Sequence, residues 1–131
     1  MGHSPVSEQR RALIVDEEII FAINLEADMH ALGFDICDLA ANGQQASKMA
    51  MSNQPDIVLM DINLEGGREG IETARWLRSV CDTPILFITG YTDPDTIDRI
   101  HEQVPGACVL SKMIYRDSLA AAVAAVAARP H

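Results

Sequence analysis

The sequence predicts a single α/β domain in which helices cover both faces of a parallel sheet. Three observations predict it: short apolar runs recur along the chain, a segment with helical periodicity follows each run, and this alternation repeats five times without an insertion. Continuous apolar runs are typical of parallel strands, because such strands are buried on both faces. Regular alternation of strand and helix then gives right-handed crossovers and three layers.

The expected strands are short and rich in β-branched residues. They cover residues 12–15, 34–39, 57–60, 85–88 and 107–110. The second strand alternates apolar and polar residues, a pattern consistent with a strand at the edge of the sheet. The order of the strands in the sheet cannot be read from these patterns.

The segments between the strands have helical patterns. The first carries one apolar residue per turn, and Gly33 ends it. Its stripe consists of Phe21, Leu25, Met29 and Leu32. In the fourth, Asp93 can cap the helix and Pro94 suits its first position. The other helices are expected at about residues 44–52, around residues 71–77 and at residues 116–128.

Length and composition bound the possibilities. The chain has 131 residues, which fits one domain, expected at residues 11–129 after a flexible tail at residues 1–10. With 10 basic and 19 acidic residues its net charge is -9, so we expect no nucleic-acid binding. We expect no membrane segment and no signal peptide, since the longest uncharged apolar stretch, residues 119–128, is too short to span a bilayer. Three cysteines far apart fit free thiols in the cytoplasm.

Polar residues follow the ends of four expected strands. They are Asp16 and Glu17 after the first, Asp61 after the third, Thr89 after the fourth and Lys112 after the fifth. Because parallel strands all point the same way, these side chains should meet at one edge of the sheet, where open α/β sheets bind ligands.

These residue types fit the chemistry of phosphoryl transfer. Three neighbouring carboxylates repel one another and need a cation, and oxygen ligands of this kind suit Mg²⁺. Enzymatic phosphoryl transfer depends mainly on positioning and charge neutralisation. We therefore predict that Asp61 attacks phosphorus while Lys112 and Thr89 stabilise the equatorial oxygens. Gly90 would leave space for a donor or a water molecule.

The same segments resemble the receiver domain of two-component response regulators over residues 10–128. They are LIVDEE at 13–18, PDIVLMD at 55–61, GIE at 70–72, PILFIT at 84–89 and the late Lys112. The resemblance implies a (βα)5 flavodoxin-like sandwich with strand order 2-1-3-4-5. It also implies Mg²⁺-dependent phosphotransfer from a histidine kinase or a phosphotransfer protein.

The resemblance also implies individual roles. Asp61 would be the phosphoacceptor, and Asp16 and Glu17 the acidic pair, with Glu17 binding the metal directly. Asn63 would offer its backbone carbonyl to the metal. Its side chain and Tyr91 would tune the lifetime of the phosphoryl group. Thr89 and Lys112 fill the remaining catalytic positions.

Three positions depart from the family pattern. Glu17 stands where Asp is usual, which adds one methylene to a metal ligand. Val109 occupies the place of the switch aromatic, so the usual coupling of Thr89 to an aromatic ring is in doubt and Tyr91 is a candidate for part of that work. Met113 replaces the usual proline after Lys112, so we expect no cis peptide bond there.

The resulting hypothesis is a stand-alone, single-domain response regulator. It would signal by protein contact through the fourth helix, the fifth strand and the fifth helix, and would catalyse only its own phosphorylation and dephosphorylation. One alternative is a receiver-like adaptor that works without phosphorylation. A hydrolase with an aspartyl nucleophile is disfavoured, because the haloacid-dehalogenase pattern needs a second Asp where Asn63 stands. The alanine-rich fifth helix leaves open contact with a partner or with a second copy in a homodimer.

Overall fold

The computed structural model describes residues 10–64 and 69–127. The predicted tail therefore lies outside the described residues except for Arg10, which already belongs to the first strand. Within the described part of the chain, no helix combines the length and the apolar character needed to cross a membrane.

The described strands form one parallel sheet. They are β1 (Arg10–Val15), β2 (Phe34–Ala40), β3 (Ile57–Met60), β4 (Ile85–Thr89) and β5 (Cys108–Ser111). Their order is β2-β1-β3-β4-β5, which confirms the order implied by the family resemblance and places β2 at an edge. The central strand β3 is buried along its whole length, as its uninterrupted apolar sequence predicts.

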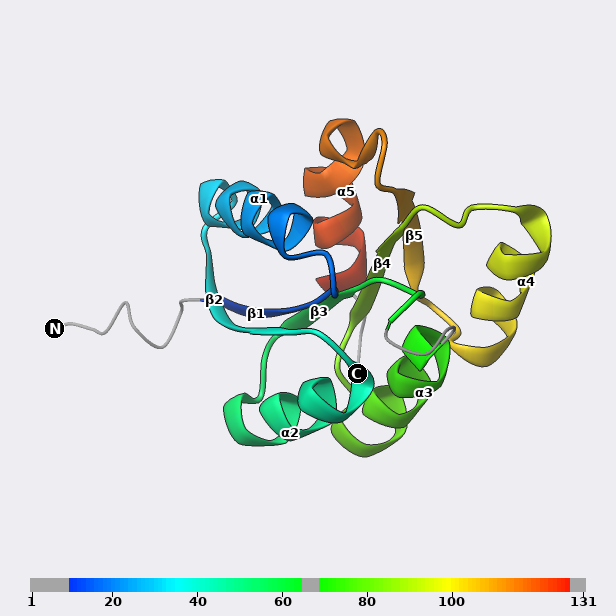
Figure 1. The fold of residues 1–131 in the computed structure, drawn as a ribbon, viewed down its shortest axis with the longest axis horizontal. Coiled ribbons are helices and arrows are strands. Elements are labelled where there is room, and N and C mark those ends of the chain that lie inside the picture. The colour runs from blue at the N-terminus through cyan, green and yellow to red at the C-terminus, as the bar shows by residue number, and fades with distance from the viewer. Residues whose placement is uncertain (1–9, 65–68, 128–131) are drawn as a thin grey trace, which may run out of the picture.

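The helices lie on both faces of this sheet (Figure 1). They are α1 (Ile19–Ala31), α2 (Gly43–Asn53), α3 (Glu69–Cys81), α4 (Pro94–Gln103) and α5 (Tyr115–Ala127). One core cluster joins α1 and α5 to the sheet, and the other joins α2, α3 and α4 to its opposite face. The predicted three-layer flavodoxin-like fold is confirmed.

Helix ends follow local side-chain chemistry. The Asp93 carboxylate accepts a hydrogen bond from the Thr96 backbone N–H at 3.1 Å, and Pro94 follows it, so the predicted start of α4 is confirmed. The prediction for Leu32 was wrong, because this side chain is 39% exposed. Leu32 is the C-cap of α1 and lies beyond its last turn, where Gly33 takes a left-handed φ of 93° and turns the chain away.

The register of the strands decides which loop residues meet. Val15 pairs with Met60, and the Asp61 N–H donates to the Val15 carbonyl at 2.9 Å, so Asp16 and Asp61 emerge side by side. Thr89 pairs with Ser111, and the Lys112 N–H donates to the Thr89 carbonyl at 3.0 Å. The carboxyl ends of β1, β3, β4 and β5 thus carry polar residues to one edge.

Candidate functional site

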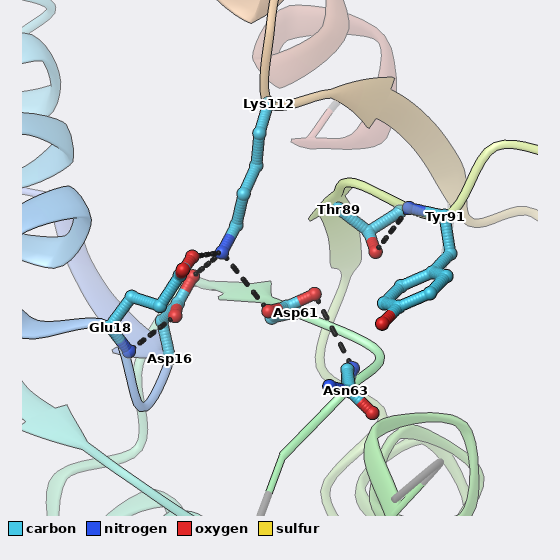
Figure 2. A network of polar contacts seen from close by, with 7 residues as sticks. All are labelled: Asp16, Glu18, Asp61, Asn63, Thr89, Tyr91 and Lys112. Carbon is cyan, nitrogen blue, oxygen red and sulfur yellow. Dashed lines mark hydrogen bonds and ion pairs between the residues drawn. The ribbon is translucent and has the colours of Figure 1, made fainter.

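Lys112 is the centre of the polar cluster at this edge. Its Nζ lies 2.9 Å from Asp16 Oδ2 and 3.0 Å from Asp61 Oδ2, and it also pairs with Glu18 Oε1. Figure 2 shows the lysine reaching down from the turn after β5 to carboxylates that come from the ends of β1 and β3. The structure therefore brings together three residues that the sequence placed after different strands.

Burial and charge act against each other in this cluster. Burial raises the pKa of the Asp16 carboxyl, although the hydrogen bond from Lys112 partly opposes that rise. Burial lowers the pKa of Lys112, but hydrogen bonds to Glu18, Asp16 and Asp61 outweigh it, so the pKa of this ammonium group ends above its usual value. The lysine therefore stays charged at neutral pH.

A pocket of about 400 Å³ opens beside Asp61. Its lining consists of Glu17, Glu18, Asp61, Asn63, Gly90, Tyr91 and Lys112. The Asp61 carboxylate is 93% buried, whereas Glu18 on the rim is 64% exposed. A ligand that enters the pocket therefore passes exposed groups before it reaches a fixed carboxylate.

Gly70 holds the loop that carries Asp61. Its N–H donates to the Ile62 carbonyl at 2.9 Å, and a Cβ on this residue would lie 2.2 Å from the Asp61 carbonyl oxygen. Only glycine allows α3 to approach the loop so closely. The Asn63 N–H makes a long hydrogen bond of 3.4 Å to Asp61 Oδ1, which helps to orient the carboxylate.

The other predicted residues lie on the opposite side of the pocket or outside it. Thr89 is fully buried, and its hydroxyl accepts a hydrogen bond from the Tyr91 N–H at 3.1 Å. Figure 2 shows the Tyr91 ring beside the pocket, and this side chain is 49% exposed. Val109 does not line the pocket; it packs on the core cluster shared by α2, α3 and α4.

The acidic residues fit a small divalent cation. Asp16, Glu18 and Asp61 each offer a carboxylate oxygen, and these oxygens lie within 4.8 Å of one another. Glu17, the predicted ligand, lines the same pocket but is exposed. An all-oxygen donor set of this kind suits Mg²⁺.

Two residues at this site had no role assigned from the sequence. Glu18 was only the third acid of a run, and its position at the N-cap of α1 turns its side chain toward Lys112. Phe21 was counted as a core residue, yet its ring centroid lies 4.6 Å from Lys112 Nζ. The acidic run beside a predicted helix start was the available signal for Glu18. For Phe21, the sequence offered none.

Comparison with known families gives a direct match. The family described as "Response regulator receiver domain" matches residues 12–124. The chain belongs to this family. The match covers all the strands and helices except the first residues of β1 and the last residues of α5, so the receiver domain accounts for the whole described fold.

Curated relatives of this receiver domain are bacterial regulators. This chain is 30% identical over 93 residues to "Transcriptional regulatory protein PdtaR" of Mycobacterium tuberculosis. The aligned residues cover 71% of this chain and 45% of the relative. This chain is also 33% identical over 82 residues to "Phyllosphere-induced regulator PhyR" of Methylorubrum extorquens. That alignment covers 62% of this chain and 31% of the relative. The receiver domain thus spans less than half the length of these relatives.

Solved structures of other receiver domains superimpose closely. The signal receiver domain of a modulated diguanylate cyclase from Desulfovibrio desulfuricans is 33% identical, with a TM-score of 0.79 over 89% of this chain and 92% of that one. A two-component response regulator from Clostridium difficile is 26% identical, with a TM-score of 0.82 over 92% and 98%. These likenesses support a response-regulator role.

Proposed function

We propose that Asp61 accepts a phosphoryl group from a histidine kinase or a phosphotransfer protein, and that the phosphorylated domain signals by contact with another protein. The observation that carries the proposal is the contact of Lys112 Nζ with the buried Asp61 carboxylate at 3.0 Å beside an open pocket. One oxygen of Asp61 can attack phosphorus while the ammonium neutralises the charge of the incoming group.

The residues in and around the pocket would divide the work of this transfer. Asp16, Glu17, Asp61 and the Asn63 carbonyl would hold Mg²⁺, which, when bound, neutralises phosphoryl oxygens. Thr89 would donate its hydroxyl to an equatorial oxygen. Asn63 and Tyr91 border the same pocket and would set how easily water reaches the phosphoryl group. In this proposal the domain turns over only its own acyl phosphate, in the cytoplasm.

Exposed apolar side chains lie on one side of the pocket and suggest where a protein donor binds. Large apolar side chains are exposed on the first turns of α1 and on the turn after β5, next to the pocket residues Glu18 and Lys112. They are Ile19, Ile20, Ile23, Met113 and Ile114, and they form what we call the apolar rim. A protein donor must bring its phosphohistidine to this pocket, so we propose that the donor packs on the apolar rim.

The downstream target is proposed to bind α4, β5 and α5, as the family resemblance implies. None of the exposed large hydrophobic side chains of the described residues lies on these three elements. The exposed residues of α4 include Asp95, Asp98 and Glu102. A target for this face would therefore present polar or basic groups.

A receiver-like adaptor that is never phosphorylated is the second candidate. Val109 favours it, because an aliphatic side chain packed on the core offers no ring to move between two positions. The two functions differ in one measurable property: only a phospho-switch changes its affinity for a partner when Asp61 is modified.

The direct test is the transfer of a phosphoryl group to Asp61. Wild type, Asp61→Asn and Asp98→Asn, an exposed α4 control, are incubated with Mg²⁺ and a small phosphodonor such as acetyl phosphate. We expect wild type and the control to gain the mass of one phosphoryl group, and Asp61→Asn to gain none. Normal phosphorylation of Asp61→Asn would refute the proposal. A wild-type protein that takes no phosphoryl group from small or protein donors would favour the adaptor.

A further inference from the structure

The ammonium group of Lys112 has no N–H left for a new ligand. A lysine has three N–H donors, and this one faces three carboxylates: Asp16 at 2.9 Å, Asp61 at 3.0 Å and Glu18. A phosphoryl group on Asp61 brings oxygens that need this ammonium. Phosphorylation of Asp61 frees the N–H that its own carboxylate accepts. Lys112 can serve a second phosphoryl oxygen only if Asp16 or Glu18 also releases an N–H.

We propose that Glu18 is a brake on phosphorylation: it occupies the Lys112 N–H that a phosphoryl oxygen needs, and it turns out into solvent when the phosphoryl group arrives. The inference rests on the proposed function of Asp61. In this inference Glu18 is a positioning residue: it acts through Lys112 and does not touch the reacting atoms.

Glu18 is the partner that can leave. The Asp16 side chain is only 3% exposed, and its other carboxylate oxygen accepts the Glu18 N–H at 2.8 Å, so Asp16 is held in place. Asp61 is the acceptor itself. The Glu18 side chain is 64% exposed, and water can solvate its carboxylate as soon as it turns away. Release of an exposed partner costs less than release of a buried one.

The lysine, in contrast, has little freedom to move away from Glu18. Its side chain is 14% exposed, and its Nζ lies 4.6 Å from the centroid of the Phe21 ring. An aromatic face attracts an ammonium group. Phe21 in turn packs edge-on against Tyr115, with ring centroids 5.3 Å apart. The exchange of partners therefore falls to Glu18.

Glu18 also adds negative charge at the mouth of the pocket. A phosphate dianion that approaches Asp61 is repelled by this carboxylate until Glu18 moves. Loss of the Glu18 charge should therefore make phosphoryl uptake easier. Glu18 also belongs to the carboxylate cluster that could hold a cation. If it were a ligand of Mg²⁺, its loss would weaken Mg²⁺ binding, and phosphoryl uptake would become harder instead.

The test compares wild type with three variants that each remove one negative charge: Glu18→Gln, Glu17→Gln and Glu26→Gln. Glu17 is the neighbouring acid proposed to bind the metal, and Glu26 lies two turns along α1, beside His30. Calorimetry measures the affinity for Mg²⁺ alone and then for beryllium trifluoride at saturating Mg²⁺. The ¹⁵N resonance of Lys112 Nζ is recorded without metal, and thermal midpoints check the fold.

For Glu18→Gln we expect beryllium trifluoride to bind about two- to fivefold more tightly, the size of one ion pair of this kind. We also expect a shifted Lys112 Nζ resonance and a nearly unchanged Mg²⁺ affinity. Glu17→Gln should bind Mg²⁺ more weakly, and Glu26→Gln should match wild type. Unchanged or weaker beryllium trifluoride binding by Glu18→Gln, or a Mg²⁺ affinity about tenfold lower, would overturn the brake.

The proposed function and the brake can fail separately. If wild type binds no beryllium trifluoride and takes no phosphoryl group, the proposed function of Asp61 fails. The Nζ resonance still reports whether Glu18 holds Lys112 in the metal-free protein. If wild type is phosphorylated normally while Glu18→Gln leaves both binding and the resonance unchanged, the brake alone is wrong.

Discussion

The two sides of the Asp61 pocket are built very differently. On the closed side, formed by α1 and the turn after β5, Lys112 is fixed by three carboxylates and by the Phe21 ring. On the open side, formed by the loop after β4, the Tyr91 side chain is half exposed, and its backbone N–H bonds to the Thr89 hydroxyl. At Gly90, next to it, no atom of the described residues other than its chain neighbours lies within 4 Å of the place where a Cβ would stand.

This difference indicates where a phosphoryl group would act first. On the closed side, Lys112 already has three carboxylate partners, and the side chains of the apolar rim lie on α1 and on the turn after β5, which carry this cluster. On the open side, the Tyr91 side chain is 49% exposed, and Val109, which packs on the core away from the pocket, provides no aromatic ring to move. We infer that phosphorylation of Asp61 would change more contacts on the closed side than on the open side.

The largest effect is expected from removing the cation of the closed side. In Lys112→Met, Asp16 and Asp61 stay buried without a counter-charge, so we expect the free energy of unfolding at neutral pH to fall by about 1–3 kcal/mol. Phosphoryl uptake should be lost. Urea titrations with and without Mg²⁺ measure the change. Added Mg²⁺ should restore part of the lost free energy of unfolding. Lys48→Met, a control on the exposed face of α2, should change that free energy little. Equal losses in both variants would contradict the comparison.

Glycine substitutions compare the two sides directly. In Gly70→Ala the new Cβ would meet the Asp61 carbonyl at 2.2 Å, and backbone atoms must shift, so we expect a loss of about 1–3 kcal/mol. Gly90→Ala meets open space and should change stability by less than about 0.5 kcal/mol. Thermal unfolding of the two variants decides the point. Similar midpoints for both would mean that α3 does not support the Asp61 loop as described.

The apolar rim provides a smaller and more selective effect. Ile20 is 71% exposed, so Ile20→Glu should leave the fold and the uptake of phosphoryl from acetyl phosphate unchanged. Transfer from a phosphorylated protein donor should slow by roughly fivefold or more, the effect of one contact worth about 1 kcal/mol. His101→Glu, on exposed α4, is the matched control. A donor that is slowed only by the α4 substitution would place donor binding on the other side.

An effect confined to alkaline pH is expected at the far end of the closed side. Burial and the hydrogen bond to Asp28 raise the pKa of Tyr115 from 10.0 to about 12. A raised pKa means that the folded protein holds this proton more tightly. The resulting stability is therefore fully present below about pH 10 and is lost as the pH rises through about 12. Chemical unfolding across this range should show the loss in wild type and much less of it in Tyr115→Phe. If the free energy of unfolding falls equally with pH in both proteins, Tyr115 is not the source of the loss.

Much of the site was predictable because parallel strands point the same way. A polar residue directly after a buried strand must emerge at the carboxyl edge, so the meeting of Asp16, Asp61 and Lys112 follows from sequence order. Thr89 also follows a buried strand and reaches the same edge, but its burial outside the lining of the pocket does not follow from this rule. The stand-alone organisation and the metal ligands stay predictions.

The sequence by itself determined the strands, the helices and the residue types that face the pocket, because hydrophobic periodicity and capping act over a few neighbouring residues. Only the tertiary structure decided which acid holds Lys112. Glu17 and Glu18 are chemically identical neighbours, and the packing of α1 on the sheet turns Glu18 to the lysine. The contact of Gly70 with the Asp61 loop was decided in the same way, by the approach of α3 to β3.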